Sequence, residues 1–296
     1  MKKTYLFAGI SIFFWSTVAV TTKLLLGAYD NIQVLWASVF FAGASLVVFN
    51  VATGNIKKIK SYTAKDYFIS MLIGLPGTFF YYIFYYAGAD MMLASQAFII
   101  NYLWPIMSVL FACIILKEKM TVRKVVAIAM SFFGVVVVTS GELLHFNKVT
   151  LLGALFCVFG AVSYGIFTAL NQKKHYDKSI TMMISYAATF VLTTVLNAAK
   201  GDLFVPSLGQ TLGFAWNGIF TMAIANTLWV IALGKGKTAK VSNLAYITPF
   251  LSLVWTGLIL KEELSIFSVI GLVIIVSGIF IQLKEKAEPK HSLKIK

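Results

Sequence analysis

The chain has 296 residues, of which 59% are hydrophobic and 12% are charged, and its mean hydropathy is +0.85. Soluble domains carry about 25% charged residues, so this composition excludes an ordinary soluble protein and indicates an integral membrane protein. The formal net charge of +14 does not indicate nucleic-acid binding, because the basic residues lie between apolar runs, where the cytoplasmic loops of membrane proteins carry them.

The apolar runs predict an all-α polytopic membrane protein. At about 20 residues per membrane-spanning helix, the chain has room for about ten spans joined by short loops. The start, Met1-Lys2-Lys3 before an apolar run, is also typical of a signal peptide, but no clean small-residue cleavage site follows, so we expect an uncleaved first span. The predicted helices, in chain order, cover residues 5–23, 32–52, 66–88, 93–116, 121–140, 150–171, 179–199, 211–233, 239–260 and 264–283.

The fourth predicted span is interrupted by a proline, in the sequence Asn101-Tyr102-Leu103-Trp104-Pro105. Proline lacks a backbone donor and clashes with the carbonyl four residues earlier, which here belongs to Asn101. Interrupted backbone at membrane depth is tolerated only where it is buried in protein or lines a watery cavity. The rings of Tyr102 and Trp104 and the Asn101 amide are therefore placed to stack on a ligand and to hydrogen-bond to it.

The same pattern returns 144 positions later as Tyr246-Ile247-Thr248-Pro249. The same shift, without a gap, aligns Lys117-Glu118 with Lys261-Glu262. Each half then holds five spans, and an odd number makes the second half enter the membrane from the opposite side, as an inverted repeat. We expect a first repeat over residues 1–144, a second over 145–283 and a basic, disordered cytoplasmic tail over 284–296. Paired proline breaks at Pro105 and Pro249 predict a transport site.

The charges predict the orientation. Of the 25 lysine and arginine residues, 21 lie in the tails and in one set of alternate loops, and four lie in the other set, namely Lys23, Lys148, Lys200 and Lys261. Because cytoplasmic loops carry the excess of positive charge, both termini are expected in the cytoplasm, with the protein in the cell's inner (plasma) membrane.

Two five-helix halves, each closing on an apolar run with Pro and then Leu-Lys-Glu, resemble the drug/metabolite transporter superfamily with its EamA-type domains. Within it, the stretches Trp15-Ser16-Thr17, 101–105 and 246–249 are most similar to the YddG-type aromatic amino-acid exporters. The resemblance implies a ten-helix basket with a central cavity, through which amino acids pass outward without a known driving ion. It also implies that aromatic side chains line the cavity, here Trp15, Tyr81, Tyr85, Tyr102 and Trp104. At the sixth-helix position the family usually has Trp, whereas this chain has Tyr164, which departs from the pattern and leaves the substrate open.

The middle of every predicted span lacks Asp, Glu, Lys, Arg and His. Ionisable residues at membrane depth mark proton relays and ion pathways, so their absence favours transport without a coupling ion. The deep polar groups are neutral, and each is suited either to a zwitterionic ligand or to interhelical hydrogen bonds. They are Ser16, Thr17, Gln96, Asn101, Ser163, Thr168, Asn226, Thr227 and Asn243.

The candidate substrate-binding residues are Trp15, Tyr81, Tyr85, Asn101, Tyr102, Trp104, Tyr164 and Tyr246. For the aromatic residues among them, core packing or a position at the membrane interface is the alternative. The predicted function is export of aromatic or large neutral amino acids and related small metabolites, and the alternative is movement of organic cations held by aromatic rings. A lipid-modifying enzyme would need a nucleophile–base pair or a metal cluster, and the sequence shows neither. The paired breaks argue against a purely structural membrane protein. We expect no cofactor, no metal and no nucleic acid, and a monomer or weak dimer in lipid.

Overall fold

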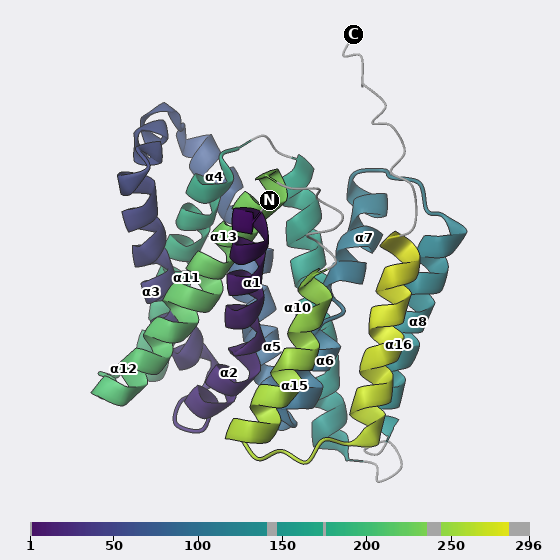
Figure 1. Cartoon of the computed structure of the whole chain (residues 1–296). Helices are drawn as coiled ribbons and strands as arrows, with labels where there is room; N and C mark the ends of the chain where they lie inside the picture. The colour runs from purple at the N-terminus through teal and green to yellow at the C-terminus, as the bar shows by residue number, and fades with distance from the viewer. Residues whose placement is uncertain (1, 141–146, 174–175, 236–243, 284–296) are drawn as a thin grey trace.

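The computed structural model describes residues 2–140, 147–173, 176–235 and 244–283, and within these ranges every regular element is helical (Figure 1). The expected tail 284–296, the expected repeat boundary at 144 and residues 239–243 of the ninth expected span lie outside them. The helices of the first half are α1 (Lys2–Ser16), α2 (Val18–Leu26), α3 (Asn31–Ala52), η1 (Asn55–Ser61), α4 (Ala64–Leu75), η2 (Pro76–Phe80), α5 (Tyr81–Met91), α6 (Ala94–Asn101), α7 (Trp104–Ile115) and α8 (Val122–Val138).

The second half begins with the two long helices α10 (Lys148–Lys173) and α11 (Lys178–Lys200). A second interrupted helix follows, and the last two helices are both apolar. These later elements are α12 (Leu208–Ala215), η3 (Trp216–Ile224), α13 (Ala225–Lys235), η4 (Ala245–Ile247), α15 (Thr248–Ile259) and α16 (Ile266–Leu283).

Six of the described helical stretches are long and apolar enough to cross a membrane. Many large apolar side chains face outward from them, such as Phe159 (51% exposed), Val191 (61%) and Val48 (68%). In water such a surface would aggregate, whereas hydrocarbon chains cover it without cost. The six stretches are Lys3–Leu26, Asn31–Ala52, Ala64–Met91, Ala94–Ile115, Lys148–Lys173 and Lys178–Lys200, and shorter apolar helices cover Ala245–Ile259 and Ile266–Ile281.

Local sequence explains where several helices begin and end. Asp30 caps α3 by accepting the Gln33 backbone N–H at 2.8 Å, and the Gln33 side-chain oxygen accepts the Asp30 backbone N–H at 3.0 Å. This reciprocal arrangement satisfies donors that a helix start leaves free. Thr63 with Asp66 does the same for α4. Gly201 ends α11 in the left-handed conformation, with φ at 75°, which glycine adopts without steric cost.

Several spans are interrupted rather than continuous. Between α6 and α7 the helix is broken at Tyr102 and Leu103, and α7 then begins with Trp104 and Pro105. The first predicted span is also broken, at Thr17, although the sequence there has no proline or glycine that would predict a break. The third and eighth spans pass through the π-helical segments η2 and η3, in which backbone hydrogen bonds join residues five apart and not four apart.

The helices pack in close neighbouring pairs, of which α8 with α16 and α5 with α10 are the most extensive. Glycine permits the closest of these contacts. A Cβ on Gly134 of α8 would lie 2.8 Å from the Gly271 carbonyl oxygen of α16, and one on Gly271 would lie 2.6 Å from the Gly134 oxygen. The α8–α16 pair forms one side of the bundle (Figure 1).

The two ends of the bundle differ. The start of α1 and the end of α16 lie at the same end, at the top of Figure 1, together with η1, the end of α10 and the start of α11. We call this the lysine-rich end, because it carries Lys57, Lys58, Lys60, Lys65, Lys173 and Lys178. The opposite end carries the α2–α3, α5–α6 and α15–α16 connections.

Candidate functional site

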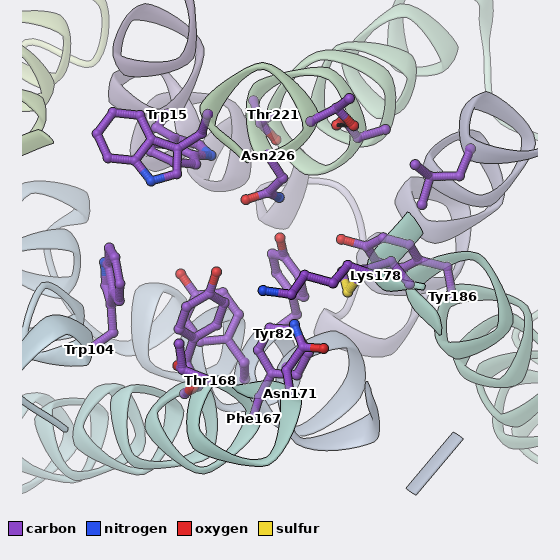
Figure 2. A pocket seen from close by; sticks show the side chains of 18 of the residues that line it. Trp15, Tyr82, Trp104, Phe167, Thr168, Asn171, Lys178, Tyr186, Thr221 and Asn226 are labelled. Atoms are coloured by element: carbon purple, nitrogen blue, oxygen red, sulfur yellow. Dashed lines mark hydrogen bonds between the residues drawn. The ribbon is translucent and has the colours of Figure 1, made fainter. Parts of the chain in front are cut away.

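A cavity of about 520 Å³ lies between the helices and is lined mainly by aromatic rings and neutral polar groups (Figure 2). Its walls come from both halves of the chain. The aromatic residues that line it are Trp15, Phe49, Tyr81, Tyr82, Phe98, Tyr102, Trp104, Tyr164, Phe167, Tyr186 and Trp229. The polar ones are Asn55, Asn101, Thr168, Asn171, Gln172, Lys178, Ser179, Thr221, Asn226, Thr227 and Thr248.

One wall is formed around the α6–α7 break. The Trp104 ring meets the Tyr164 ring of α10 edge to face, with centroids 5.1 Å apart, and meets Tyr102 at 6.2 Å. The Tyr102 hydroxyl donates to the Ala245 carbonyl oxygen at 2.5 Å, and so joins this break to the η4 segment of the second half. Two rings two residues apart would face different sides of a regular helix. The broken backbone lets both line one cavity.

A tyrosine pair continues this wall deeper into the bundle. The Tyr81 ring lies 4.9 Å from the Tyr164 ring, and its hydroxyl accepts a hydrogen bond from the Asn101 side-chain nitrogen at 2.9 Å. The side-chain oxygen of Asn101, Oδ1, is buried with no hydrogen-bond partner among the described residues, and so is the Thr248 hydroxyl. Both residues line the cavity, so they offer unsatisfied polar atoms to a ligand.

The facing wall is formed by α1 and α13. The Trp15 ring packs against Trp229 at 5.3 Å, and Figure 2 shows Trp15 across the cavity from Trp104. Asn226 donates its amide N–H to the Met222 carbonyl at 2.6 Å, which leaves its side-chain oxygen for the cavity. The arrangement is therefore a slot between aromatic rings with amides and hydroxyls at its edges.

Six of the eight residues proposed from the sequence line this cavity, and two do not. Tyr85 is fully buried below it and stacks on Tyr81, with ring planes 12° apart. Tyr246 is 8% exposed and packs on Phe280 at 5.1 Å. Of the paired prolines, Pro105 lies in the first turn of α7 and Pro249 in the first turn of α15.

Sequence reasoning missed several lining residues. Tyr82 lies beside the helix face that Tyr81 and Tyr85 share, Tyr186 and Trp229 lie in spans without a proline break, and Lys178 lies at a helix start. Two tryptophans outside the cavity prove to be structural. Trp216 donates its indole N–H to Thr17, and Trp255 donates to Ser16, both at 2.9 Å, so they brace the break between α1 and α2.

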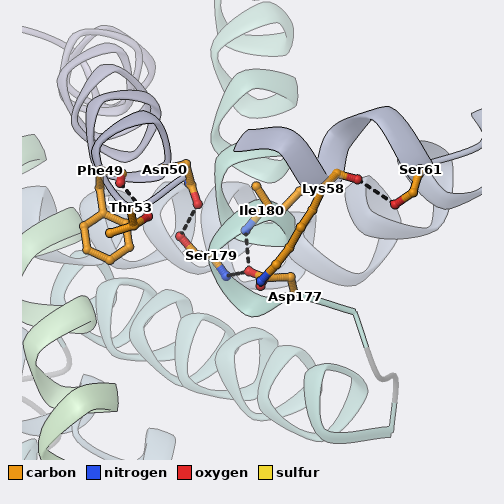
Figure 3. Close-up of polar contacts among 8 residues, drawn as sticks. All are labelled: Phe49, Asn50, Thr53, Lys58, Ser61, Asp177, Ser179 and Ile180. Carbon is orange, nitrogen blue, oxygen red and sulfur yellow. Dashed lines mark hydrogen bonds and ion pairs between the residues drawn. The ribbon is translucent and has the colours of Figure 1, made fainter. Parts of the chain in front are cut away.

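The cavity opens toward the lysine-rich end, where Asn55, Asn171, Gln172, Lys178 and Ser179 line its mouth. Hydrogen bonds fix this rim (Figure 3). Asp177 caps α11 and pairs with Lys58 of η1, and the Ser179 hydroxyl donates to Asn50 of α3 at 2.9 Å. Burial alone would raise the pKa of Asp177, but the bonds from Lys58 and from the α11 backbone N–H groups outweigh it and lower this pKa.

The opposite end is closed by two charged side chains that bind backbone groups. Lys23 donates to the Ala89 and Met92 carbonyl oxygens at 2.7 and 2.8 Å, at the end of α5. The Glu262 carboxylate accepts the Ala94 and Ser95 backbone N–H groups at 2.7 and 3.0 Å, at the start of α6. Both ends of the α5–α6 connection are thus tied to other segments, and none of the described cavity-lining residues lies at this end of the bundle.

Among the described lining residues there is no Asp, Glu or His. Nor do the described parts of the chain hold a group of three or more residues suited to a metal ion. The site can therefore bind a small molecule by aromatic stacking, by hydrogen bonds and by the positive charge of Lys178.

The apolar helices surround an internal aromatic cavity that opens at one end. This arrangement is that of a polytopic helical membrane protein that binds a small molecule. The EamA-like transporter family matches residues 2–140 and again residues 149–283, so the chain belongs to this family. The protein is therefore a multi-pass membrane transporter of a small molecule, in a lipid environment, and not an enzyme.

Relatives extend along most of the chain. An uncharacterised transporter of Clostridium kluyveri is 27% identical and covers 94% of this chain and 92% of its own. The transporter YoaV of Bacillus subtilis is 25% identical, with 90% and 91% covered. The aromatic amino acid exporter YddG of Ancylobacter novellus is also 25% identical, with 82% and 83% covered. A solved crystal structure superposes with a TM-score of 0.68 at 22% identity, over 94% and 96% of the two chains, which supports the fold.

Proposed function

We propose that this transporter exports aromatic or large neutral amino acids and related small metabolites, by ion-independent facilitated diffusion with alternating access. The observation that carries the proposal is the cavity itself, a slot between Trp15, Trp104, Tyr164 and Tyr81. Flat rings of this kind hold an aromatic or branched side chain by stacking and area burial. The likeness to an aromatic amino acid exporter supports the same substrate class.

The absence of acidic and histidine side chains from the described lining supports ion independence. A proton-coupled carrier needs a group that gains and loses a proton during the cycle, and such groups lie at membrane depth. The neutral amides and hydroxyls around the rings bind a zwitterion without changing protonation state. Alternating access is supported by the contrast between an open lysine-rich end and a closed opposite end.

For the architecture we propose ten spans arranged as two inverted five-helix repeats, residues 1–144 and 145–283. The double match to the family supports two similar units. So does the backbone, because Lys117 and Lys261 lie 144 positions apart and are both left-handed, with φ of 59° and 54°. Each follows an apolar helix that has Pro105 or Pro249 in its first turn. The lysine distribution supports a plasma-membrane protein with both termini in the cytoplasm.

Transport of labelled L-phenylalanine into liposomes that contain the purified protein tests this function. The substrate should equilibrate down its own gradient with no change of internal pH, and unlabelled aromatic amino acids should compete. Accumulation that scales with an imposed pH gradient would show proton coupling. Organic cations are the second candidate, because aromatic faces also bind quaternary amines. Competition by tetraethylammonium, and none by amino acids, would establish that alternative instead.

A further inference from the structure

Lys178 is the single charged side chain among the cavity-lining residues that the structure describes. It is the first residue of α11, and its ammonium end is directed into the cavity, between Asn226 and Asn171 in the view of Figure 2. The rest of the described lining is neutral. A ligand in the slot therefore meets one positive charge and no negative one.

The neighbours of Lys178 fix its position in the chain, and among the described residues no carboxylate pairs with it. The nearest carboxylate in sequence, Asp177, pairs with Lys58 and also accepts the Ser179 and Ile180 backbone N–H groups at 3.0 and 3.2 Å (Figure 3). Asp177 thus points toward η1, whereas Lys178 points inward. Ser179 ties the same turn to Asn50, so the start of α11 is fixed on both sides of Lys178.

We propose that Lys178 binds the carboxylate of the transported molecule, and that the cavity therefore selects aromatic and large apolar carboxylates, with or without an amino group, over organic cations. This inference rests on the proposed function and names the substrate class of the same cavity. An ammonium beside a carboxylate makes a charge-assisted hydrogen bond, stronger than one between neutral groups. The aromatic body of the ligand then occupies the slot between Trp104 and Trp15.

The amino group contributes little to recognition in this arrangement. In the described lining it finds neutral acceptors, such as the side-chain oxygens of Asn226 and Asn101, and no carboxylate. It is also repelled by Lys178, as any ligand cation is. Removing the amino group from a substrate should therefore preserve binding, and removing its carboxylate should weaken it.

Three probes with one ring and different charges test this selectivity, namely L-phenylalanine, 3-phenylpropanoate and 2-phenylethylammonium. Binding to the full-length protein in detergent is measured by titration calorimetry, which avoids leakage of the neutral acid through a bilayer. For the unaltered protein, 3-phenylpropanoate should bind at least as tightly as phenylalanine. The amine should bind at least about tenfold more weakly, since it lacks the charge-assisted bond.

Lys178→Gln should weaken binding of both carboxylates about tenfold and leave the amine unchanged or improved. Lys178→Arg keeps the charge and should restore carboxylate binding to within a few-fold. The matched control is Lys173→Gln, which removes an exposed lysine from the same end of the bundle without touching the cavity lining. This control should bind all three probes as the unaltered protein does.

Equal affinity of Lys178→Gln and the unaltered protein for the carboxylates would overturn the assignment, as would tighter binding of the amine than of 3-phenylpropanoate. These results leave the proposed function standing as long as phenylalanine still binds and moves in liposomes. If none of the three probes binds the unaltered protein, both the assignment and the proposed function fail.

Discussion

At the scale of single residues, Trp104 combines the features expected of a substrate contact. It lies at the α6–α7 break, lines the cavity and meets Tyr164 edge to face. A ring stacked on an aromatic ligand contributes about 0.5–1.5 kcal/mol beyond area burial. We therefore expect Trp104→Ala to weaken phenylalanine binding at least several-fold in the calorimetric titration, with the protein still folded and inserted.

The control for Trp104 has to be an aromatic residue outside the cavity that carries no structural bond. Trp255 does not qualify, because its indole N–H is bonded to Ser16. Phe133 does, since it is 60% exposed on the lipid-facing side of α8. Phe133→Ala should bind substrate normally. An unchanged affinity in Trp104→Ala, or an equal loss in Phe133→Ala, would place the binding site elsewhere.

The sequence predicted which types of side chain line the cavity better than it predicted how far the cavity extends into the bundle. Four of the predicted residues that line the cavity lie beside helix interruptions, namely Trp15, Asn101, Tyr102 and Trp104. For the last three, the nearby Pro105 predicts the interruption from sequence. Tyr81 and Tyr85 share a helix face by spacing alone, but the cavity ends between them, and Tyr85 packs below it. Depth depends on neighbouring helices, which no local pattern reports. The charge pattern places Lys178 among the 21 basic residues of the tails and alternate loops, and the direction of its side chain does not follow from it, because bonds of Asp177 and Ser179 to other segments position this turn.

At the scale of elements, the start of α6 depends on a side chain from another helix connection. Glu262 accepts two backbone N–H groups there, as a capping residue does, and it also faces the positive end of the helix dipole. Loss of such a cap typically costs about 1 kcal/mol. We expect Glu262→Ala to lower the thermal unfolding midpoint of the protein in detergent by a few degrees.

Glu263 provides the comparison for this measurement, because it is the adjacent acidic residue and is exposed. Glu263→Ala should leave the midpoint within about one degree, as surface substitutions usually do. The same fall in both variants would mean that loss of charge, and not loss of the α6 cap, is responsible.

Element boundaries followed from the sequence where caps, prolines or charged loops mark them. α3, α7 and α11 begin within a few residues of the sequence prediction for those spans, or directly at the proline. The break at Thr17 and the π-helical segments η2 and η3 were not foreseen. Thr17 and Ser16 have no strong local preference for a break. Their bonds to Trp216 and Trp255 stabilise it, and those partners are about 200 residues away in the chain.

At the scale of the whole molecule, the proposed orientation makes the lysine-rich end cytoplasmic. Single cysteines in a background without Cys113 and Cys157 test it by labelling intact cells with a membrane-impermeant thiol reagent. Val205, 95% exposed at the opposite end, should label as Val205→Cys. Lys57→Cys, exposed on η1, should label only after the membrane is opened. The reverse pattern would invert the orientation.

The Lys178 ammonium, which pairs with no carboxylate in the described part of the chain, also affects the return of the carrier once its substrate has left. When a carboxylate is bound, closing the mouth encloses a neutralised pair, whereas closing it on an empty cavity encloses a lone charge among aromatic rings. Enclosing an unpaired charge costs several kcal/mol. On the proposed mechanism the empty carrier therefore reorients more slowly than the loaded one. The rate at which substrate on one side exchanges for substrate on the other should then exceed the rate of net efflux. Substrate added on the far side of the membrane should then speed the release of labelled substrate, and Lys178→Gln should remove that acceleration.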